Sequence, residues 1–210
     1  MKVNRLCALA ALATAAQCIA QPSGELAPMR DSTTTVPASE APPVPQFSDS
    51  SSRLSYLRWL TAMTERMGRN PPQGQAPIEF LQTAWYESKR AGLDVSLVLG
   101  IVEVMSGFHR YSVQPSGALG YMAVDPTWSR RIGDGDVSKL MRPQSNLRFG
   151  CVILRQYLDA NRGNVSITLH QYVASNLGLA DTNPRVEATV NKVFDAQSRW
   201  AFVDTPAARQ

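Results

Sequence analysis

The side chains with catalytic or metal-binding potential are few in this sequence. It contains two histidines, His109 and His170, and neither belongs to a metal-binding HExxH or paired-cysteine spacing. We therefore expect neither a metal site nor a cofactor. Cys151 shares an apolar helical stripe with Leu147 and Leu154. No neighbour in sequence suggests an activated thiolate, so we expect a core cysteine rather than a nucleophile.

The stretch from residue 94 to 125 is predicted to form the core helix and the loop that would position the side chains of a functional site. Asp94 is a suitable N-cap, and residues 95–105 leave almost no polar face. Such a helix is enclosed by other elements in a soluble protein. Ser106 and Gly107 should end it, and a turning loop should follow, with Pro115, Gly117 and Gly120. We expect a cleft where the core helix meets this loop.

Several separated blocks resemble a known family. The first two are Met105-Ser106-Gly107-Phe108 and Gly120-Tyr121-Met122-Ala123. They resemble the catalytic segment of the lytic transglycosylases of the soluble (SLT) type, relatives of goose-type lysozyme, which read Glu-Ser-Gly-Phe and Gly-Leu/Tyr-Met-Gln. Asn146 and Gly150 match the family's Asn-x-x-x-Gly helix, and Tyr172 matches its Ala-Tyr-Asn tyrosine. The resemblance spans roughly residues 76 to 180.

The resemblance implies a mainly α, lysozyme-like (α+β) fold. We expect a single compact helical domain with at most a small β-hairpin by the cleft, between Ser112 and Val124. Helices are expected from Pro77 to Gly92 with Ile78, Leu81, Trp85 and Ser88 on one face, over 145–162 and 165–176, and from Asn183 onward.

The resemblance also implies a chemistry. These enzymes cleave bacterial peptidoglycan with one glutamate, which protonates the glycosidic oxygen and then helps to form a 1,6-anhydro ring. Here Met105 occupies that position, and a thioether neither donates nor accepts a proton in this range. The family's serine, glutamine, methionine and asparagine are also replaced, by Gln114, Ala123, Asp125 and Val173. The sequence therefore predicts that the fold is retained while the chemistry is lost.

Two carboxylates are candidates for a relocated acid. Glu103 precedes Met105 by two residues, which turns it about 200° away around a helix. We expect a surface charge there. Asp125 follows the glycine loop and could face the cleft. An active lytic transglycosylase that uses a relocated carboxylate is therefore the alternative interpretation, with Asp125 ahead of Glu103.

The resemblance suggests which residues contact glycan: Tyr172, Gln114, Tyr121, Met122 and Ala123. For Tyr172 the alternative is a core tyrosine with a hydrogen-bonded hydroxyl. Trp128 could be a sugar platform, but we favour a core position.

The N-terminal region indicates export. Residues 1–20 read as a signal peptide with a small-residue cleavage site at Ala20. The sequence before Cys18 is a poor lipobox, so lipoprotein anchoring is not expected. Residues 21–52 are rich in Pro, Ser and Thr and predict a disordered linker. No segment has the apolar length of a membrane span, and we expect a periplasmic protein.

The charge distribution is compatible with an anionic wall polymer. The chain carries +4, which includes Lys2, Arg5 and a net −3 over residues 21–52, so residues 53–210 carry +5. Lysine and arginine are dispersed, which does not favour nucleic acid. We expect peptidoglycan glycan strands as the partner.

A further stripe precedes the domain at 76–210. Residues 53–75 contain leucines and methionines at helical spacing, at Leu54, Leu57, Leu60, Met63 and Met67. We expect this helix to pack on the domain. The alternative is a docking surface for envelope secretion or conjugation machinery. The predicted function is an exported, peptidoglycan-associated, transglycosylase-like pseudoenzyme that binds glycan or acts as a scaffold.

Overall fold

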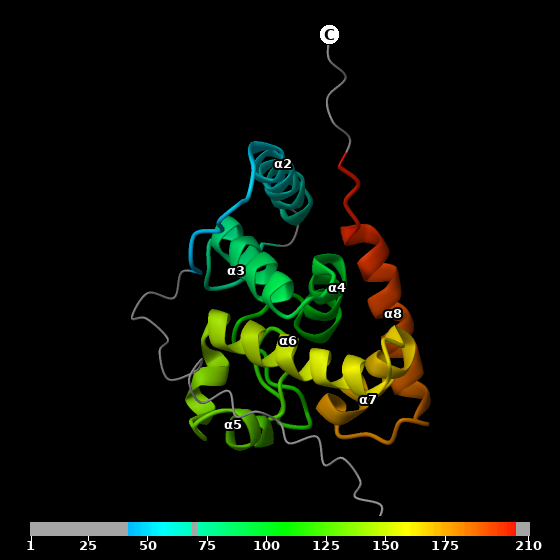
Figure 1. Cartoon of the computed structure of the whole chain (residues 1–210). Helices are drawn as coiled ribbons and strands as arrows, with labels where there is room; N and C mark the ends of the chain where they lie inside the picture. Colours follow the sequence, from blue (N-terminus) through cyan, green and yellow to red (C-terminus); the bar gives the residue numbers. More distant parts are fainter. Residues whose placement is uncertain (1–41, 69–70, 205–210) are drawn as a thin grey trace, which may run out of the picture.

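The computed structural model describes residues 42–68 and 71–204, and this part of the chain is helical (Figure 1). In chain order the elements are α2 (Ser50–Met67), α3 (Pro77–Arg90), α4 (Val95–Ser106), α5 (Thr127–Ile132), the 3-10 helix η1 (Val137–Met141), α6 (Pro143–Ala160), α7 (Val165–Leu177) and α8 (Pro184–Trp200). The expected mainly α, lysozyme-like single domain is confirmed.

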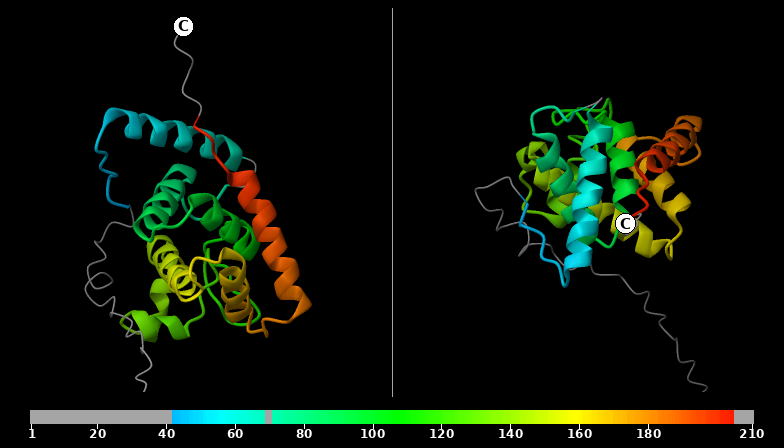
Figure 2. Two further views of the ribbon diagram at one scale, coloured as in Figure 1. Left: turned by 45° about the vertical axis from the view of Figure 1, so that its right-hand side comes forward. Right: turned by 90° about the horizontal axis from the view of Figure 1, so that it is seen from above.

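Helix α4 is the core of the fold, as predicted. The Asp94 carboxylate accepts a hydrogen bond from the Ser96 amide at 2.9 Å and caps the helix. Residues 95–102 are all buried. Gly100 allows close approach of α8, because a Cβ there would lie 2.9 Å from the Gln197 amide nitrogen. The views in Figures 1 and 2 show α4 among α3, α6, α7 and α8.

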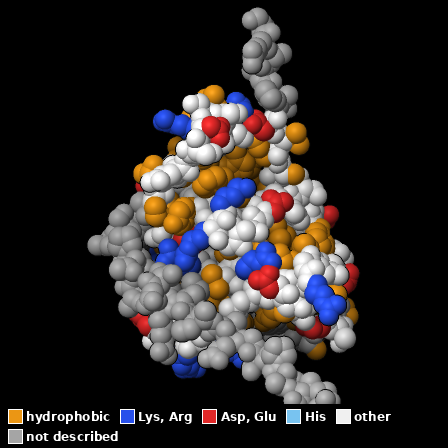
Figure 3. Space-filling model, in the orientation of Figure 1, with side chains coloured by type: hydrophobic (Ala, Val, Ile, Leu, Met, Phe, Trp, Pro, Cys, Tyr) orange, Lys and Arg blue, Asp and Glu red, His pale blue; other side chains and the backbone are white. Residues whose placement is uncertain are grey.

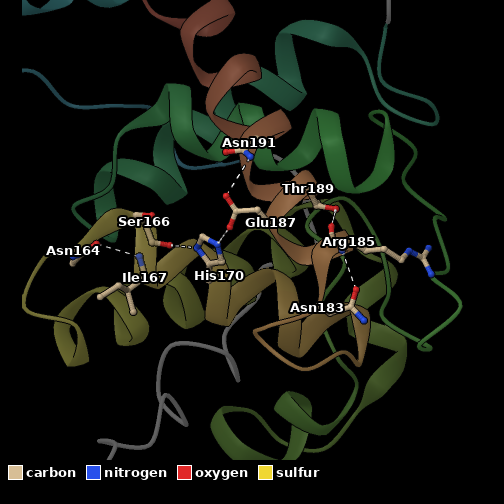
Figure 4. A network of polar contacts seen from close by, with 9 residues as sticks. All are labelled: Asn164, Ser166, Ile167, His170, Asn183, Arg185, Glu187, Thr189 and Asn191. Atoms are coloured by element: carbon tan, nitrogen blue, oxygen red, sulfur yellow. Dashed lines mark hydrogen bonds and ion pairs between the residues drawn. The ribbon is translucent and has the colours of Figure 1, made fainter.

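The C-terminal helices begin as their sequences predict. Pro143 and Pro184 occupy the first turns of α6 and α8, and Asn164 caps α7. At the surface, the His170 ring joins α7 to α8 through the Glu187 carboxylate at 2.6 Å (Figure 4).

Helix α2 packs on α3 with a different face from the predicted one. Its buried side chains are Tyr56, Trp59, Met63 and Met67, whereas Leu54 and Leu57 are 53% and 45% exposed. The predicted stripe is therefore wrong in its N-terminal half. Large aromatic rings bury more apolar area than leucines do, so the face of α2 that carries Tyr56 and Trp59 is the buried one.

Helix α2 also begins earlier than expected. Asp49 caps it through the Ser52 amide at 2.8 Å, so residues 50–52 of the predicted linker are helical. Arg58 forms an ion pair with Asp204 at 2.6 Å, which holds the C-terminal segment against α2.

Helix α3 buries most of the predicted face. Leu81 and Ser88 are buried and Trp85 is half-buried, but Ile78 is 50% exposed. Phe80 and Ala84, which the prediction did not include, are also buried. The ring of Phe80 lies against Tyr121 with centroids 4.9 Å apart, and this aromatic packing determines which face is buried.

The region after the core helix contains two short helices that the sequence did not suggest, α5 and η1. They flank the predicted loop at Asp134 to Asp136. Within the described residues, the place of the expected hairpin holds only isolated bridges, Val113 with Leu119 and Leu119 with Val124.

The signal peptide at 1–20 and most of the linker at 21–52 lie outside the described residues. Across residues 42–68 and 71–204, none of the helices combines the length and apolar character needed to cross a membrane.

Candidate functional site

The candidate site forms where α4 ends. Met105 lies in the last turn of this helix and is 5% exposed. Gly107 ends the helix in the left-handed region at φ 57°, and Phe108 follows at φ 62°. Two successive residues in this sparsely populated region turn the chain sharply. The loop from 109 to 125 therefore begins beside the Met105 backbone.

Asn146 of α6 holds the far side of this loop. Its side-chain oxygen accepts from the Met122 amide at 2.8 Å, and its side-chain nitrogen donates to the carbonyl oxygens of Leu119 and Leu140, each at 2.8 Å. A Cβ at Gly120 would lie 2.3 Å from the same nitrogen. The Asn146 side chain therefore packs directly on the backbone of Gly120, where there is no room for a side chain.

Gly150 lies one turn further along α6 and completes this fit. A Cβ at Gly150 would lie 2.3 Å from the sulfur of Met122. The spacing Asn-x-x-x-Gly places both contacts on one face of the helix. Together, Asn146 and Gly150 let the Gly120–Met122 turn pack directly against α6.

Tyr172 and Tyr121 anchor the turn from inside the protein. The Tyr172 hydroxyl donates to the Met122 carbonyl at 2.8 Å, and the Tyr121 hydroxyl donates to the Gln73 carbonyl at 3.1 Å. Both side chains are fully buried. Burial raises the pKa of Tyr121 to about 12 and raises that of Tyr172 further. These tyrosines are structural hydrogen-bond donors in this conformation, as the alternative for Tyr172 anticipated.

The predicted glycan contacts differ in exposure. Met122 and Ala123 are fully buried like the two tyrosines, and Ala123 has the left-handed φ of 50°. Gln114 is half-buried, and its side-chain amide donates to the Met105 carbonyl. Of the five predicted contacts, only Gln114 presents a side chain at the surface.

Glu103 faces α8 rather than the site. Its two oxygens accept from the Arg199 guanidinium and the Trp200 indole nitrogen, each at 2.6 Å. This position agrees with the expected turn away from Met105. The carboxylate joins the two central helices and does not reach the loop.

Asp125 organises the start of α5. Its side-chain oxygen accepts from the Thr127 amide at 2.7 Å, and its backbone carbonyl accepts from the Trp128 amide at 3.1 Å. This is an Asx turn that starts a short helix. Trp128 itself is buried, so the preference for a core tryptophan is confirmed.

A polar residue beside Tyr172 was not identified from sequence. The Asn176 side chain is 1% exposed, and its amide makes no hydrogen bond of normal geometry within the described residues. The Ser116 hydroxyl donates to the backbone carbonyl of Asn176 at 2.5 Å, and this hydrogen bond joins the loop to α7. Asn176 could have been identified from the sequence, because it follows Tyr172 by four residues and therefore lies on the same face of α7.

The comparisons with known proteins match this arrangement. The family model described as the transglycosylase SLT domain matches residues 83–194, more than half of the chain. The chain belongs to this SLT family. Residues 83–194 include α4, the loop and the α6 and α7 contacts that form the candidate site.

Named relatives of the SLT domain come from several bacteria. A protein named membrane-bound lytic murein transglycosylase C from Haemophilus ducreyi is 31% identical over 162 residues, which cover 71% of this chain and 42% of that relative. One of the same name from Glaesserella parasuis is 40% identical over 110 residues, covering 49% of this chain and 30% of the relative. The chain thus spans less than half the length of these relatives.

A solved structure shares the fold of this SLT domain. The X-ray structure of an inactive mutant of lytic transglycosylase Slt from Pseudomonas aeruginosa superposes with a TM-score of 0.50 at 22% identity, covering 71% of this chain and 29% of that one. The likeness concerns the architecture alone.

Proposed function

We propose that this protein is an exported, peptidoglycan-associated member of the SLT family that lacks the catalytic glutamate and binds glycan without cleaving it. One observation supports the loss of chemistry most directly. By the motif resemblance, the family's acid position falls at Met105, and this side chain is buried at the end of α4 and has no titratable group.

The two carboxylates considered as substitutes have other partners. Glu103 is bonded to Arg199 and Trp200 of the neighbouring helix. Asp125 is half-buried and bonded to the Thr127 amide. General acid–base catalysis requires a group within hydrogen-bond reach of the leaving oxygen. Neither bonding pattern favours a proton donor beside Met105.

The retained loop supports glycan binding. Asn146, Gly150 and Tyr172 still hold the Gly120–Met122 turn by direct contacts. We propose that the buried residues Tyr121, Met122, Ala123 and Tyr172 shape the groove floor, and that Gln114 contacts the sugar. The names of the curated relatives, which are murein transglycosylases, make murein the proposed ligand of this chain.

A scaffolding role within the envelope is the second candidate. The exposed Leu54 and Leu57 on α2 support it, because they leave an apolar face available to a protein partner. Loss of a co-purified envelope protein in Leu57→Glu, with sacculus binding intact, would support this role, and retention would oppose it.

Digestion of purified sacculi by the full chain tests the proposal. Sedimentation measures binding, and mass spectrometry of the supernatant measures products. We expect binding without release of anhydro-muropeptides. Release by the unmodified protein would contradict the proposal, and its loss in Asp125→Ala would identify the relocated acid of the alternative interpretation.

Met105→Glu is the informative variant, with Met105→Gln as its matched control. A glutamate at this buried helix end would have a raised pKa, because burial disfavours the charged form. Since one acid–base group contributes about 10²–10⁴ in rate, we expect Met105→Glu to gain detectable anhydro-muropeptide release and Met105→Gln to remain inert.

A further inference from the structure

A cavity lies at the end of the core helix opposite to Met105. It measures about 710 Å³ and lies between α2, α3, the start of α4 and the segment at 201–204. Asp94, Val95 and Ser96 form part of its wall, whereas Met105 lies about 15 Å further along the helix axis. None of the residues from 107 to 125 lines it. It is separate from the site at Met105.

Aromatic rings form much of the cavity wall. Tyr56 lies 4.8 Å from Trp85 and 5.2 Å from Phe47 between ring centroids, and Trp59 stacks beside Tyr56 at 6.1 Å. Phe202 adds a further ring from the C-terminal segment. Figure 3 shows hydrophobic side chains gathered next to the charged outer surface of α2.

Small hydroxyl groups line the same cavity. Ser51, Ser52 and Ser55 lie on one face of α2, and Ser96 opposes them from α4. Hydroxyls can both donate and accept hydrogen bonds. The wall therefore combines apolar rings with groups that can bind a polyhydroxylated ligand.

The charges of the wall are mixed. Lys89 and Asp94 contribute one charge of each sign, and Asp204 is neutralised by Arg58 at 2.6 Å. A phosphate or other polyanion would need an excess of cations. This balance favours an uncharged ligand.

The cavity continues beyond the aromatic ridge. A neighbouring cavity of about 610 Å³ shares Phe47 and Tyr56 and is also lined by Leu57 of α2 and Gln82 of α3. The Tyr56 hydroxyl is buried and has the side chain of Gln82 beside it, and Gln82 lines the same cavity. Two adjoining cavities suit an extended molecule.

We propose that these cavities along α2 form a second binding site, which takes the uncharged pyranose rings of a saccharide chain. The apolar face of a pyranose packs on aromatic rings while its hydroxyls bond to serine, glutamine and carboxylate groups. This proposal rests on the proposed binding of wall glycan. It adds a contact at the end of α4 opposite to Met105, so that one domain holds a glycan at two places.

Titration of the full chain with the tetramer of N-acetylglucosamine tests this site. The NMR signals of the indole groups report location, because Trp59 and Trp85 line the cavity and Trp128 lies in α5. We expect saturable shifts of Trp59 and Trp85 with Trp128 unchanged. Backbone amide signals are followed in the same titration, and amide shifts confined to residues 107–125 would overturn the proposal.

Ser55→Gln places a longer side chain in the cavity, and Thr61→Gln on the exposed surface of the same helix is its control. We expect Ser55→Gln to weaken binding of the tetrasaccharide by about tenfold or more and Thr61→Gln to leave the affinity unchanged. Ser51→Gln, further out on α2, serves if Ser55→Gln fails to fold. Equal affinity in all variants would overturn the proposal.

Sacculus sedimentation in parallel separates this site from the proposed function. Sacculus binding without shifts at Trp59 and Trp85 would overturn the second site and leave the proposed function supported. Tetrasaccharide binding at α2 without sacculus binding would support the second site and contradict the proposed function.

Discussion

At the scale of single residues, the motif positions have distinct physical roles. Asn146 satisfies three backbone groups of the loop and η1, and Tyr172 satisfies a fourth. Met105 contributes apolar packing and a carbonyl that accepts from Gln114. The residues that match the family's motifs thus hold the loop in place, and the Met105 side chain contributes packing.

The first prediction concerns Asn146→Ala. This change leaves the Met122 amide and the Leu119 and Leu140 carbonyls without their partner. Because unpaired buried groups are costly, we expect the free energy of unfolding to fall by about 2–4 kcal/mol. Urea unfolding followed by circular dichroism measures it.

Asn191→Ala is the matched control for that prediction. Asn191 is exposed on α8 and makes one long hydrogen bond, to Glu187 at 3.3 Å. We expect a change below about 0.5 kcal/mol. Equal losses in both variants would mean that Asn146 does not stabilise the loop in the way described.

At the scale of elements, the crossing of α4 and α8 determines the core. Gly100 lies against the backbone of α8, and the Glu103 carboxylate bonds to Arg199 and Trp200 near the end of the same pair. The helices approach closely at the glycine and are joined by charge and hydrogen bonds one turn later. This contact places the end of α4 relative to α7 and the loop.

Gly100→Ala tests the close crossing. The new Cβ would lie 2.9 Å from the Gln197 nitrogen and 3.0 Å from the Val193 carbonyl oxygen, and the backbone must shift to relieve both contacts. We expect destabilisation by about 1–3 kcal/mol in urea unfolding, as for other overpacked cores.

Gly68→Ala provides the comparison. Gly68 has a helical φ of −53°, and its Cβ would meet only the carbonyls of its own helix, at 3.2 Å or more. The unfolding free energy should change by less than about 0.5 kcal/mol. If Gly100→Ala were as mild, the two helices would not be closely packed at this point.

At the scale of the whole molecule, stability should depend on pH through the junction of α7 and α8. The His170 Nδ1 lies 2.8 Å from the Ser166 carbonyl and its Nε2 lies 2.6 Å from the Glu187 carboxylate. Both are acceptors, so the doubly protonated ring fits best (Figure 4). The Glu187 hydrogen bond is the main cause that raises the pKa of His170.

The sign of the pH effect follows from this raised pKa. The stabilisation is complete below the pKa of the unfolded histidine, near 6.5, and is lost as the pH rises through the folded pKa. We expect the urea midpoint to fall between pH 6 and 8 more in the parent than in His170→Gln. The effect should be small and weaken with salt, because the pair is exposed.

Two variants check the assignment of this pH dependence. Glu187→Gln should reduce it as His170→Gln does, because both remove the same pair. His109→Gln, which removes the other histidine, should leave the contribution of His170 in place. An unchanged pH profile in His170→Gln would contradict the role of this junction.

The sequence by itself determined the helical architecture and the family. The ends of these helices could be predicted because they depend on neighbouring residues alone. Asp94 and Asn183 cap helices through nearby backbone amides, and Gly107 ends α4 with its left-handed conformation. The motif spacing predicted that the candidate site lies at the end of α4. The orientation of Glu103 also followed from helical geometry alone.

Only the tertiary structure decided which faces and which side chains are available. Leu54, Leu57 and Ile78 follow helical periodicity, yet aromatic packing between α2 and α3 leaves them exposed. Tyr172 is buried by packing, and its hydroxyl is satisfied by the Met122 carbonyl, 50 residues earlier in the chain. Such contacts depend on long-range packing, which periodicity does not describe. The larger cavity along α2 likewise exists only because segments from both ends of the described chain meet there.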